Sequence, residues 1–317
     1  MTDISLLCLV GATGTGKTAA ALALARALGG AVINFDSRQV YAGLGVVTAQ
    51  PTAEERAVCP HALYGYLPLS TPVRAGAFAA EIMDQARAYR DQGLAPILVG
   101  GTGLYLKSLV DGLAPIPDID PRIREEVVRE CRDQGSQVLH GRLQLLDPDY
   151  AAKIHPNDPQ RICRALEVIA ATGQTLTWWH AQTSRPAGLR VLKIGISADL
   201  NSLTPRLARR IDLMLEAGAR EEVRLAYEGC PDRTAPGFSG IGCPELLAVL
   251  LDGMSLDQAR RDWLRSTRAY AKRQLTWFNK DSEIFWHHPE DVNGIVARAA
   301  RFLEPAHVEV AAHRGTR

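Results

Sequence analysis

The sequence has no apolar run long enough to cross a membrane, and its start, MTDISLLCLVG, has no basic segment ahead of the first apolar run. A membrane-spanning helix needs about 20 consecutive apolar residues, and a secretory signal begins with a positively charged segment. The pattern therefore argues against a membrane protein or a secreted one, and we expect a cytoplasmic protein.

Paired cysteines are lacking as well. None of the six cysteines stands in a C-x-x-C pair, and Cys8 lies inside an apolar run that predicts a buried strand. An even number of cysteines is compatible with disulfides, but reduced thiols in a cytosolic protein fit this arrangement better.

Net charge is almost absent, because 36 Lys and Arg residues stand against 35 Asp and Glu residues, for a formal charge of +1. Overall charge therefore neither indicates nor excludes a nucleic-acid partner, and any basic surface must be local. The chain has 317 residues, of which 46% are hydrophobic, enough for one large domain or two smaller ones with a proper core.

Short apolar runs alternate with helical patterns in much of the chain. Four runs predict buried strands, at residues 6–10, 31–36, 94–101 and 190–197. Helices are predicted between them, at 17 to about 28 and at about 75–91. This alternation is typical of a parallel sheet with helices on both faces.

The alternation stops between about residues 120 and 185, where one helical pattern follows another without a strand-like run. We therefore predict an α/β core formed by residues 1–119 and 186–317, interrupted by an all-helical insertion at 120–185. After the fourth strand the chain is expected to be mostly helical, and its last residues, AAHRGTR, to form a disordered tail.

The first predicted strand runs directly into an octet of the form G-x-x-x-x-G-K-T, which consists of Gly11, Ala12, Thr13, Gly14, Thr15, Gly16, Lys17 and Thr18. The glycines let the backbone turn its N–H groups inward, and the start of the following helix adds partial positive charge. Lys17 is expected to reach terminal phosphate oxygens, and the Thr18 hydroxyl to bind Mg²⁺. The octet therefore predicts a phosphate-binding loop rather than a glycine-rich turn with an exposed lysine.

The acid that ATP- and GTP-hydrolysing proteins usually carry at the end of a later strand is missing, because the third predicted strand ends in PILVGGTGLY. An acid comes instead after the second strand, at Asp36, which would face the loop across the carboxyl edge of the sheet. A general base for an acceptor substrate would stand there, although Asp36 could equally be a turn residue or a helix N-cap. Thr102 would add a hydroxyl at the same edge.

Positive charge is concentrated in residues 260–280, where seven Lys and Arg residues stand against one acid. Four of them are spaced by 4, 3 and 4 and so share one face of a helix: Arg261, Arg265, Arg268 and Lys272. A solvated helix face usually interleaves acids, so this face predicts a surface for a polyanion, with a plain solvated surface as the alternative.

A second basic signal opens the helix predicted after HPNDP, with Asp158 as its N-cap and Gly173 as its end. Gln160, Arg161 and Arg164 occupy its first turns, where they could contact bases and phosphates or simply be solvated. The insertion has nine basic and nine acidic residues, so any RNA would be recognised there by shape and a few placed residues.

Together the motifs resemble those of the bacterial tRNA dimethylallyltransferases, the isopentenyl-diphosphate:tRNA transferases. The matching stretches follow the family order and span nearly the whole chain: GATGTGKT, DSRQVY, VGGTGLY, IHPNDPQRICRALEV, GIG at 240–242 and TRAYAKRQLTWF. The resemblance implies a P-loop NTPase-like core with a helical insertion that holds the anticodon stem-loop. It also implies that a monomer, using Mg²⁺, moves the dimethylallyl group of dimethylallyl diphosphate to the N6 amine of the adenine just 3′ of the anticodon.

The resemblance further implies roles for individual residues. The loop at 13–18 would hold the donor diphosphate, with Arg206 and Arg210 near it, and Asp36 would be the general base, joined in catalysis by Lys17 and Thr102. Three groups of residues would contact tRNA: Asp36, Ser37, Arg38 and Gln39; Gln160, Arg161, Ile162, Cys163 and Arg164; and Thr102 with Arg124.

Three stretches depart from the usual family pattern. Val47 and Gln50 replace a glycine and a lysine, the stretch PHALYG lacks an acid after His61, and Cys243 and Pro244 stand where Tyr and Lys are usual. The octet, Asp36 and the segment from Gln160 are intact, so we expect activity to be retained.

Two other functions are compatible with parts of the sequence. A small-molecule or nucleoside kinase would use the same loop and an acid after the second strand, but it would have no use for the basic helix at 260–280. A non-catalytic RNA-binding protein would use the basic helix, but it would not need Lys17, Thr18 and Asp36.

Overall fold

The computed structural model describes residues 4–304, so the tail predicted at the end of the chain lies outside the described residues. Within them six strands form one parallel sheet in the order β3-β2-β4-β1-β5-β6. The strands are β1 (Ile4–Gly11), β2 (Gly30–Asn34), β3 (His61–Ala62), β4 (Ala95–Val99), β5 (Leu189–Ile196) and β6 (Ile284–His287). The predicted parallel sheet is therefore confirmed.

The four predicted strands are β1, β2, β4 and β5, and the sequence did not predict β3 or β6. β3 has two residues, and β6 has four residues in a region that was expected to be mostly helical. β6 forms because it pairs in parallel with β5, from Lys193 opposite Ile284 to Ile196 opposite His287. Such pairing partners are distant in sequence and leave no local pattern.

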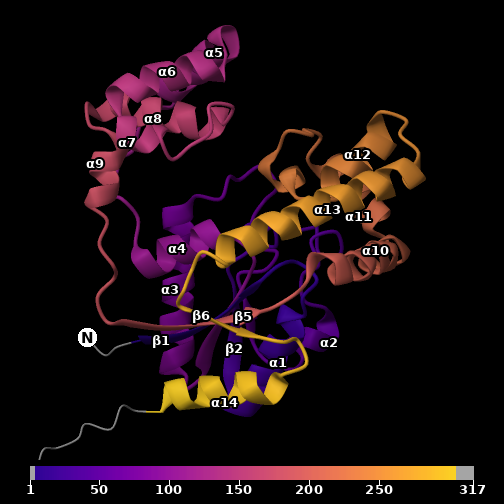
Figure 1. Ribbon diagram of the computed structural model, residues 1–317. Helices are drawn as coiled ribbons and strands as arrows, with labels where there is room; N and C mark the ends of the chain where they lie inside the picture. Colours follow the sequence, from indigo (N-terminus) through magenta and orange to yellow (C-terminus); the bar gives the residue numbers. More distant parts are fainter. Residues whose placement is uncertain (1–3, 305–317) are drawn as a thin grey trace, which may run out of the picture. The chain divides into compact units, whose positions relative to one another are not determined.

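Helices cover both faces of this sheet (Figure 1). On one face, α1 (Lys17–Leu28) packs beside α14 (Val292–Leu303), and one buried cluster joins Leu24 and Ile295 of these helices to Leu9 of β1. On the other face lies α3 (Ala75–Asp91), through Phe78 and Ile82. Because side chains alternate along a strand, β1 is buried on both sides, as its continuous apolar run predicted.

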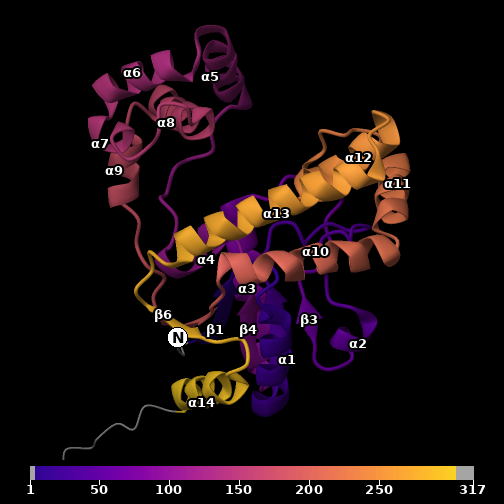
Figure 2. The same cartoon turned by 45° about the vertical axis from the view of Figure 1, so that its right-hand side comes forward.

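The remaining helices of this part of the chain include a group beyond the carboxyl edge of the strands, where α10 and α13 run side by side (Figure 2). Besides α1, α3 and α14, the helices of this part of the chain are α2 (Ala53–Arg56), α4 (Gly103–Asp111), α10 (Leu200–Glu216), α11 (Ala219–Gly229), the 3-10 helix Pro236–Ser239, α12 (Cys243–Leu251) and α13 (Leu256–Phe278). Leu203 and Leu207 of α10 and Ala271 of α13 form a buried cluster with Ala12. The two helices therefore pack directly on the octet.

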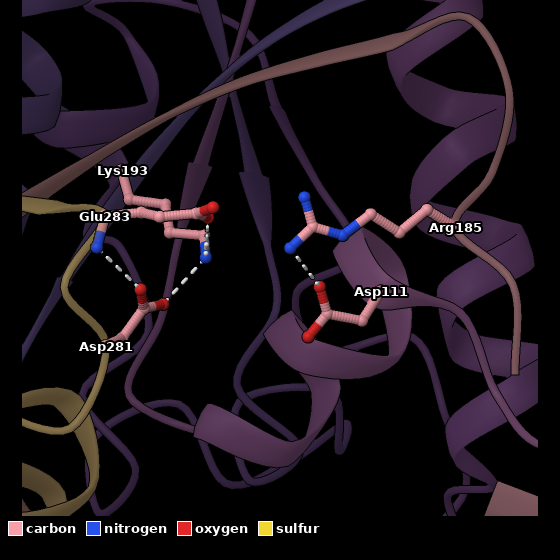
Figure 3. Close-up of polar contacts among 5 residues, drawn as sticks. All are labelled: Asp111, Arg185, Lys193, Asp281 and Glu283. Carbon is pink, nitrogen blue, oxygen red and sulfur yellow. Dashed lines mark hydrogen bonds and ion pairs between the residues drawn. The ribbon is translucent and has the colours of Figure 1, made fainter. Parts of the chain in front are cut away.

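A buried charge anchors the turn between α13 and β6. Lys193 of β5 donates hydrogen bonds to Asp281 (2.7 Å) and Glu283 (2.9 Å), as Figure 3 shows. Burial alone would lower the pKa of Lys193, but the two carboxylates outweigh it and the pKa is raised. The ion pairs therefore tie the end of α13 to the sheet.

The chain divides into two compact units, of which the second is Ser108–Ala187 and contains the predicted insertion at 120–185. Its helices are α5 (Pro121–Gln134), α6 (Ser136–Leu146), α7 (Pro148–Ala151), α8 (Pro159–Thr172) and α9 (Leu176–Ala181). They share a core of their own that includes Leu139, Leu143 and Leu166. An ion pair of 3.2 Å between Asp111 and Arg185 joins the first and last segments of this unit (Figure 3).

Candidate active site

The octet forms the connection from β1 to α1 with a conformation that its own residues stabilise. Gly14 has a φ of +81°, in the left-handed region, and a Cβ there would lie 2.7 Å from Leu207 Cδ2. The buried Thr15 hydroxyl donates to the Ala12 carbonyl over 2.9 Å. The loop is therefore preformed, and the start of α1 points its N–H groups toward any anion bound there.

Lys17 is folded back over this loop. Its Nζ donates to the carbonyls of Gly11 (3.0 Å) and Ala12 (2.7 Å). Burial lowers the pKa of Lys17 to about 8, while the carboxylate of Asp36 opposes this change and Arg210 reinforces it. The amine is therefore a positive charge in a poorly solvated place, where a bound anion would stabilise it strongly.

α10 adds a second cation to the loop. Arg210 Nη1 lies 3.4 Å from Thr13 Oγ1, and burial lowers the pKa of Arg210 while Glu55 and Asp36 oppose that change. Arg206, one turn earlier, is exposed. Of the two arginines predicted near a diphosphate, the structure therefore places Arg210 against the loop, and the role of Arg206 stays a prediction.

Asp36 follows β2 at the same edge of the sheet and takes one of the roles considered from sequence, that of a turn residue, while its role as a general base stays a prediction. No helix begins there, but Oδ1 accepts a hydrogen bond from the Arg38 N–H (2.9 Å), which makes Asp36 a turn residue. Its other oxygen, Oδ2, would lie 3.7 Å from a Cβ placed on Gly101. One carboxylate oxygen thus holds the turn while the other faces the end of β4.

The backbone around Asp36 is held by Asn34, a fully buried polar residue at the end of β2. Asn34 Oδ1 accepts from the Asp36 N–H (2.7 Å), and Asn34 Nδ2 donates to the carbonyls of Asp36 (3.0 Å) and Leu63 (2.8 Å). The position of the predicted general base is therefore fixed from both sides of its peptide.

The turn after β4 closes the site. Gly100 packs so tightly that a Cβ there would lie 2.9 Å from the backbone of Phe35, next to Asp36. Thr102 Oγ1 is buried and finds no hydrogen-bond partner of normal geometry among residues 4–304. Tyr270 of α13 lies near it. Burial and the charge of Asp36 raise the pKa of Tyr270, whereas the Thr102 side chain lowers it in part. The Thr102 hydroxyl and Tyr270 therefore lie together at this edge of the site, where the hydroxyl can contact a substrate.

The rest of the predicted segment 36–39 is engaged within the protein. Ser37 is buried, and Gln39 Nε2 donates to the carbonyls of Thr48 (3.0 Å) and Ala49 (2.8 Å). Arg38 is exposed and hydrogen-bonds to Ser239 Oγ, before the GIG stretch. Contacts of these residues with tRNA stay a prediction.

Two of the departures from the family pattern lie against each other. Gln50 replaces the usual lysine, and its Oε1 would come within 2.6 Å of a Cβ on Gly65, the last residue of PHALYG, which lacks the usual acid. The position that lacks the usual lysine therefore lies against the position that lacks the usual acid. Because both charges are replaced together, neither is left without its partner.

The other residues that depart from the family pattern, Val47, Cys243 and Pro244, lie next to the GIG stretch at 240–242. Val47 and Cys243 are buried, and a Cβ on Gly242 would lie 2.8 Å from Val47. Burial raises the pKa of Cys243 to about 12, so that its thiol stays neutral. Pro244 occupies the first turn of α12, where proline fits a helix.

The four positive residues of the predicted stripe are all exposed on α13, whereas the opposite face of the helix is buried through Ala259, Trp263, Ala271, Gln274 and Phe278. Arg265 pairs with Asp262 (2.8 Å), and Arg268 hydrogen-bonds to Thr204 of α10 (3.1 Å). Arg260 instead forms an ion pair with Asp212 of α10. The stripe is therefore available to a partner, and its binding to tRNA stays a prediction.

The predicted tRNA-contacting helix of the insertion is α8. It has the expected ends, because Asp158 accepts from the Arg161 N–H (3.1 Å) and Gly173 closes the helix in a left-handed conformation. Gln160, Arg161 and Arg164 are exposed, as is Arg124 of α5. Ile162 and Cys163 are buried in the core of the insertion, so their side chains face away from solvent.

The residues available to Mg²⁺ are few. Within residues 4–304 no group of three or more His, Cys, Asp or Glu side chains could hold a metal ion, and Thr18 offers an exposed hydroxyl in the first turn of α1. Mg²⁺ is commonly held by one or two protein oxygens, water and the phosphates of a substrate. The loop fits an ion that arrives with a diphosphate.

Sequence reasoning missed three residues of this site: Asn34, Tyr270 and Gln274. Gln274 is buried and accepts a hydrogen bond from the Thr13 N–H (2.8 Å). A usable signal existed for Asn34 and Gln274, since each is a single amide at a position that the apolar pattern assigns to the core.

Comparison with known proteins agrees with this geometry. The family model described as IPP transferase matches residues 39–281. A tRNA dimethylallyltransferase of Nitratidesulfovibrio vulgaris is 53% identical, over 95% of this chain and 94% of that relative. The corresponding protein of Desulfovibrio desulfuricans is 52% identical, over 96% and 94%.

Two solved structures are similar in fold. A tRNA isopentenylpyrophosphate transferase of Bacillus halodurans has 33% identity and a TM-score of 0.71, covering 95% of this chain and 97% of that one. A eukaryotic dimethylallyltransferase acting on tRNA has 27% identity and a TM-score of 0.78, covering 94% and 77%. No helix within residues 4–304 is long and apolar enough to cross a membrane.

Proposed function

The chain belongs to the IPP transferase family, and on that premise we propose that it transfers a dimethylallyl group from dimethylallyl diphosphate to tRNA. The acceptor would be the N6 amine of the adenine just 3′ of the anticodon. The observation that carries the proposal is the meeting of Lys17, Arg210 and Asp36 at one edge of the sheet: two cations that suit a leaving diphosphate lie beside one carboxylate that suits an attacking amine.

In the donor half of the reaction, the C–O bond between the allylic carbon and the diphosphate breaks, and its electron pair stays on the diphosphate. Lys17, Arg210 and the N–H groups of the loop would stabilise this developing charge, because they are already in place and poorly solvated. Mg²⁺ bound with the diphosphate, with the Thr18 hydroxyl among its ligands, would neutralise part of the same charge.

In the acceptor half, the adenine would leave the stack of the anticodon loop to bring its N6 amine to the allylic carbon. The nitrogen lone pair forms the new C–N bond, and the amine proton passes to the Asp36 carboxylate. Because Asn34 and the Arg38 N–H hold Asp36 in place, its free oxygen can orient the amine before transfer. The buried Thr102 hydroxyl would bind the same nucleotide.

For tRNA we propose two surfaces, each on a different unit. The exposed stripe Arg261, Arg265, Arg268 and Lys272 would contact phosphates, whose binding is electrostatic and insensitive to sequence. Gln160, Arg161 and Arg164 of α8, with Arg124 of α5, would contact the anticodon stem-loop. We propose a monomer that acts in the cytoplasm, where its substrate is found.

The kinase alternative is not favoured by the relatives, which are named as tRNA dimethylallyltransferases. A prenyl-transfer assay, followed where it fails by a tRNA-binding assay and a nucleoside phosphorylation assay, separates the three functions. Labelled dimethylallyl diphosphate is incubated with the protein and bulk tRNA, and label in precipitated RNA is counted. The control is a tRNA in which the adenine 3′ of the anticodon is changed.

Transfer to the first tRNA and not to the second is expected. Label that never enters RNA, although the protein binds tRNA, would point to a non-catalytic RNA-binding protein. Failure with tRNA together with phosphate transfer from ATP to a nucleoside would favour the kinase.

A further inference from the structure

Gln274 connects two loops whose relative position matters for the proposed reaction. It lies on the buried face of α13, with 5% of its surface exposed. Its Oε1 accepts from the Thr13 N–H of the phosphate loop (2.8 Å), and its Nε2 donates to the Gly101 carbonyl after β4 (2.9 Å). One amide therefore bridges the ends of β1 and β4.

The approach of this amide is so close that only glycine fits beside it. A Cβ on Gly101 would lie 2.0 Å from Gln274 Nε2, a distance that no side chain tolerates. The orientation of the amide is also unambiguous, since the Thr13 N–H can only donate and the Gly101 carbonyl can only accept. The side chain at position 274 must therefore accept one hydrogen bond and donate another, and an amide can do both.

Each end of the bridge carries a residue of the proposed site. The Thr13 hydroxyl accepts a hydrogen bond from Arg210 (3.4 Å), and Gly101 is followed directly by Thr102, whose hydroxyl oxygen is buried. The Asp36 Oδ2 also faces Gly101. The bridge therefore fixes the side that would hold the diphosphate against the side that would hold the amine.

We propose that Gln274 is a positioning residue for prenyl transfer, which sets the distance between the donor loop and the acceptor side of the site. The inference rests on the proposed function. Gln274 would not touch either substrate; it would act by holding Thr13 and Gly101. Since a misplacement of about 1 Å between reacting groups can cost about 10²-fold in rate, loss of the bridge should lower the rate of transfer more than the affinity for either substrate.

The variant Gln274→Glu tests this directly. A carboxylate can still accept from the Thr13 N–H, but it repels the Gly101 carbonyl. A protonated carboxyl can accept and donate as the amide does. Burial and Asp36, which faces Gly101, should raise the pKa of the introduced carboxyl, whereas Arg210 beside Thr13 should lower it, and in either case the protonated fraction increases as the pH falls.

The measurement is the single-turnover rate at saturating donor and tRNA, as a ratio of variant to wild type, from about pH 8 down to about pH 6. We expect a deficit of about 10²-fold at the alkaline end, shrinking several-fold toward the acid end as the carboxyl regains its proton. Taking the ratio removes the titration of Asp36 and of the substrates, which both proteins share.

Two further variants complete the design. Gln274→Met keeps the volume but loses both hydrogen bonds, and should show the deficit at every pH without recovery. Thr276→Ala is the matched control, because Thr276 lies on the exposed face of α13 and its hydroxyl bonds within its own helix, to Lys272 (2.9 Å).

The outcomes are distinct. An unaltered rate in Gln274→Glu, a ratio independent of pH, or a loss confined to substrate affinity would overturn the inference. Failure of both Gln274 variants to fold would overturn it as well, because the amide would then be structural. If the wild-type protein itself transfers no dimethylallyl group to tRNA, the proposed function has failed instead.

Discussion

The phosphate loop and the outer face of α13 both present positive residues, but the surroundings of these residues differ in solvation and in contacts. Lys17 is held over the loop by two backbone carbonyls, and Arg210 contacts Thr13. Arg261, Arg265 and Lys272 of α13 instead project from an exposed surface. The first pair is poorly solvated and already oriented, whereas the second set is exposed to solvent.

The two environments suit different tasks. A poorly solvated cation has a lowered pKa and interacts strongly with charge that develops next to it, which suits a leaving group. An exposed cation interacts weakly with any one partner and is screened by salt, but several together attract a polyanion.

The largest effect is expected at Asp36, the carboxylate whose charge acts on both Lys17 and Arg210. Asp36→Asn keeps the size of the side chain and an oxygen for the Arg38 N–H, but it cannot accept a proton. The single-turnover rate with saturating donor should fall by about 10²–10⁴-fold, with little change in tRNA affinity. Asp199→Asn is the control, since Asp199 caps α10 through the Ser202 N–H (2.8 Å). A near wild-type rate in Asp36→Asn would leave Asp36 as a turn residue only.

The next effect concerns the cation on the donor side. Lys17→Ala removes a charge that should stabilise the leaving diphosphate, and transfer should slow by about 10²–10³-fold. Affinity for tRNA should stay nearly unchanged, because the exposed surfaces would carry that binding. Both quantities are measured beside Arg26→Ala, an exposed change on the same helix. Equal losses of turnover and tRNA affinity would break the proposed division between the regions.

A smaller effect follows from the pKa of Lys17, which is about 8. A diphosphate should bind the protonated amine and raise its pKa, so binding takes up a proton above about pH 8. Affinity for inorganic diphosphate should therefore fall as pH rises, by up to about tenfold per pH unit. Calorimetric titration at several pH values measures this. The same slope in Lys17→Met would show that the diphosphate alone, and not Lys17, causes it.

The smallest effect is expected on the exposed stripe, and it should appear as a dependence on salt. Replacing Arg261 and Arg265 with Gln should reduce the slope of log K for tRNA against log salt by somewhat under one unit per lost phosphate contact. The paired control is Arg87→Gln with Arg90→Gln, on α3. An unaltered slope in the α13 variant would show that this face is plain solvated surface, and would remove half of the comparison.

Much of the fold was predictable because its signals are local. The octet lies between an apolar run and a run of helix-forming residues, and α1 and α3 begin and end at the predicted residues. α8 has the predicted cap at Asp158 and the predicted end at Gly173. β6 was missed because its pairing with β5 joins residues about 90 positions apart, such as Lys193 and Ile284.

The predicted site was incomplete for a similar reason. Lys17 and Asp36 were found because each follows a strand of a parallel sheet, and the carboxyl ends of such strands meet at one edge. Residues 160–164 were all predicted to contact tRNA, whereas in α8 Gln160, Arg161 and Arg164 face solvent and Ile162 and Cys163 face the core. Once the core is known, the face of the helix on which each residue lies distinguishes the exposed residues from the buried ones.

Short-range patterns in the sequence therefore encode the octet between β1 and α1, four of the six strands of the described residues, the helical insertion and the basic stripe of α13. Which residues meet at the octet depends on tertiary packing. Gln274 lies 261 residues from Thr13, and Arg210 lies 197 residues from it, yet both reach the same loop. The packing of α10 and α13 on that loop makes these contacts, and packing between distant segments leaves no period or spacing in the sequence.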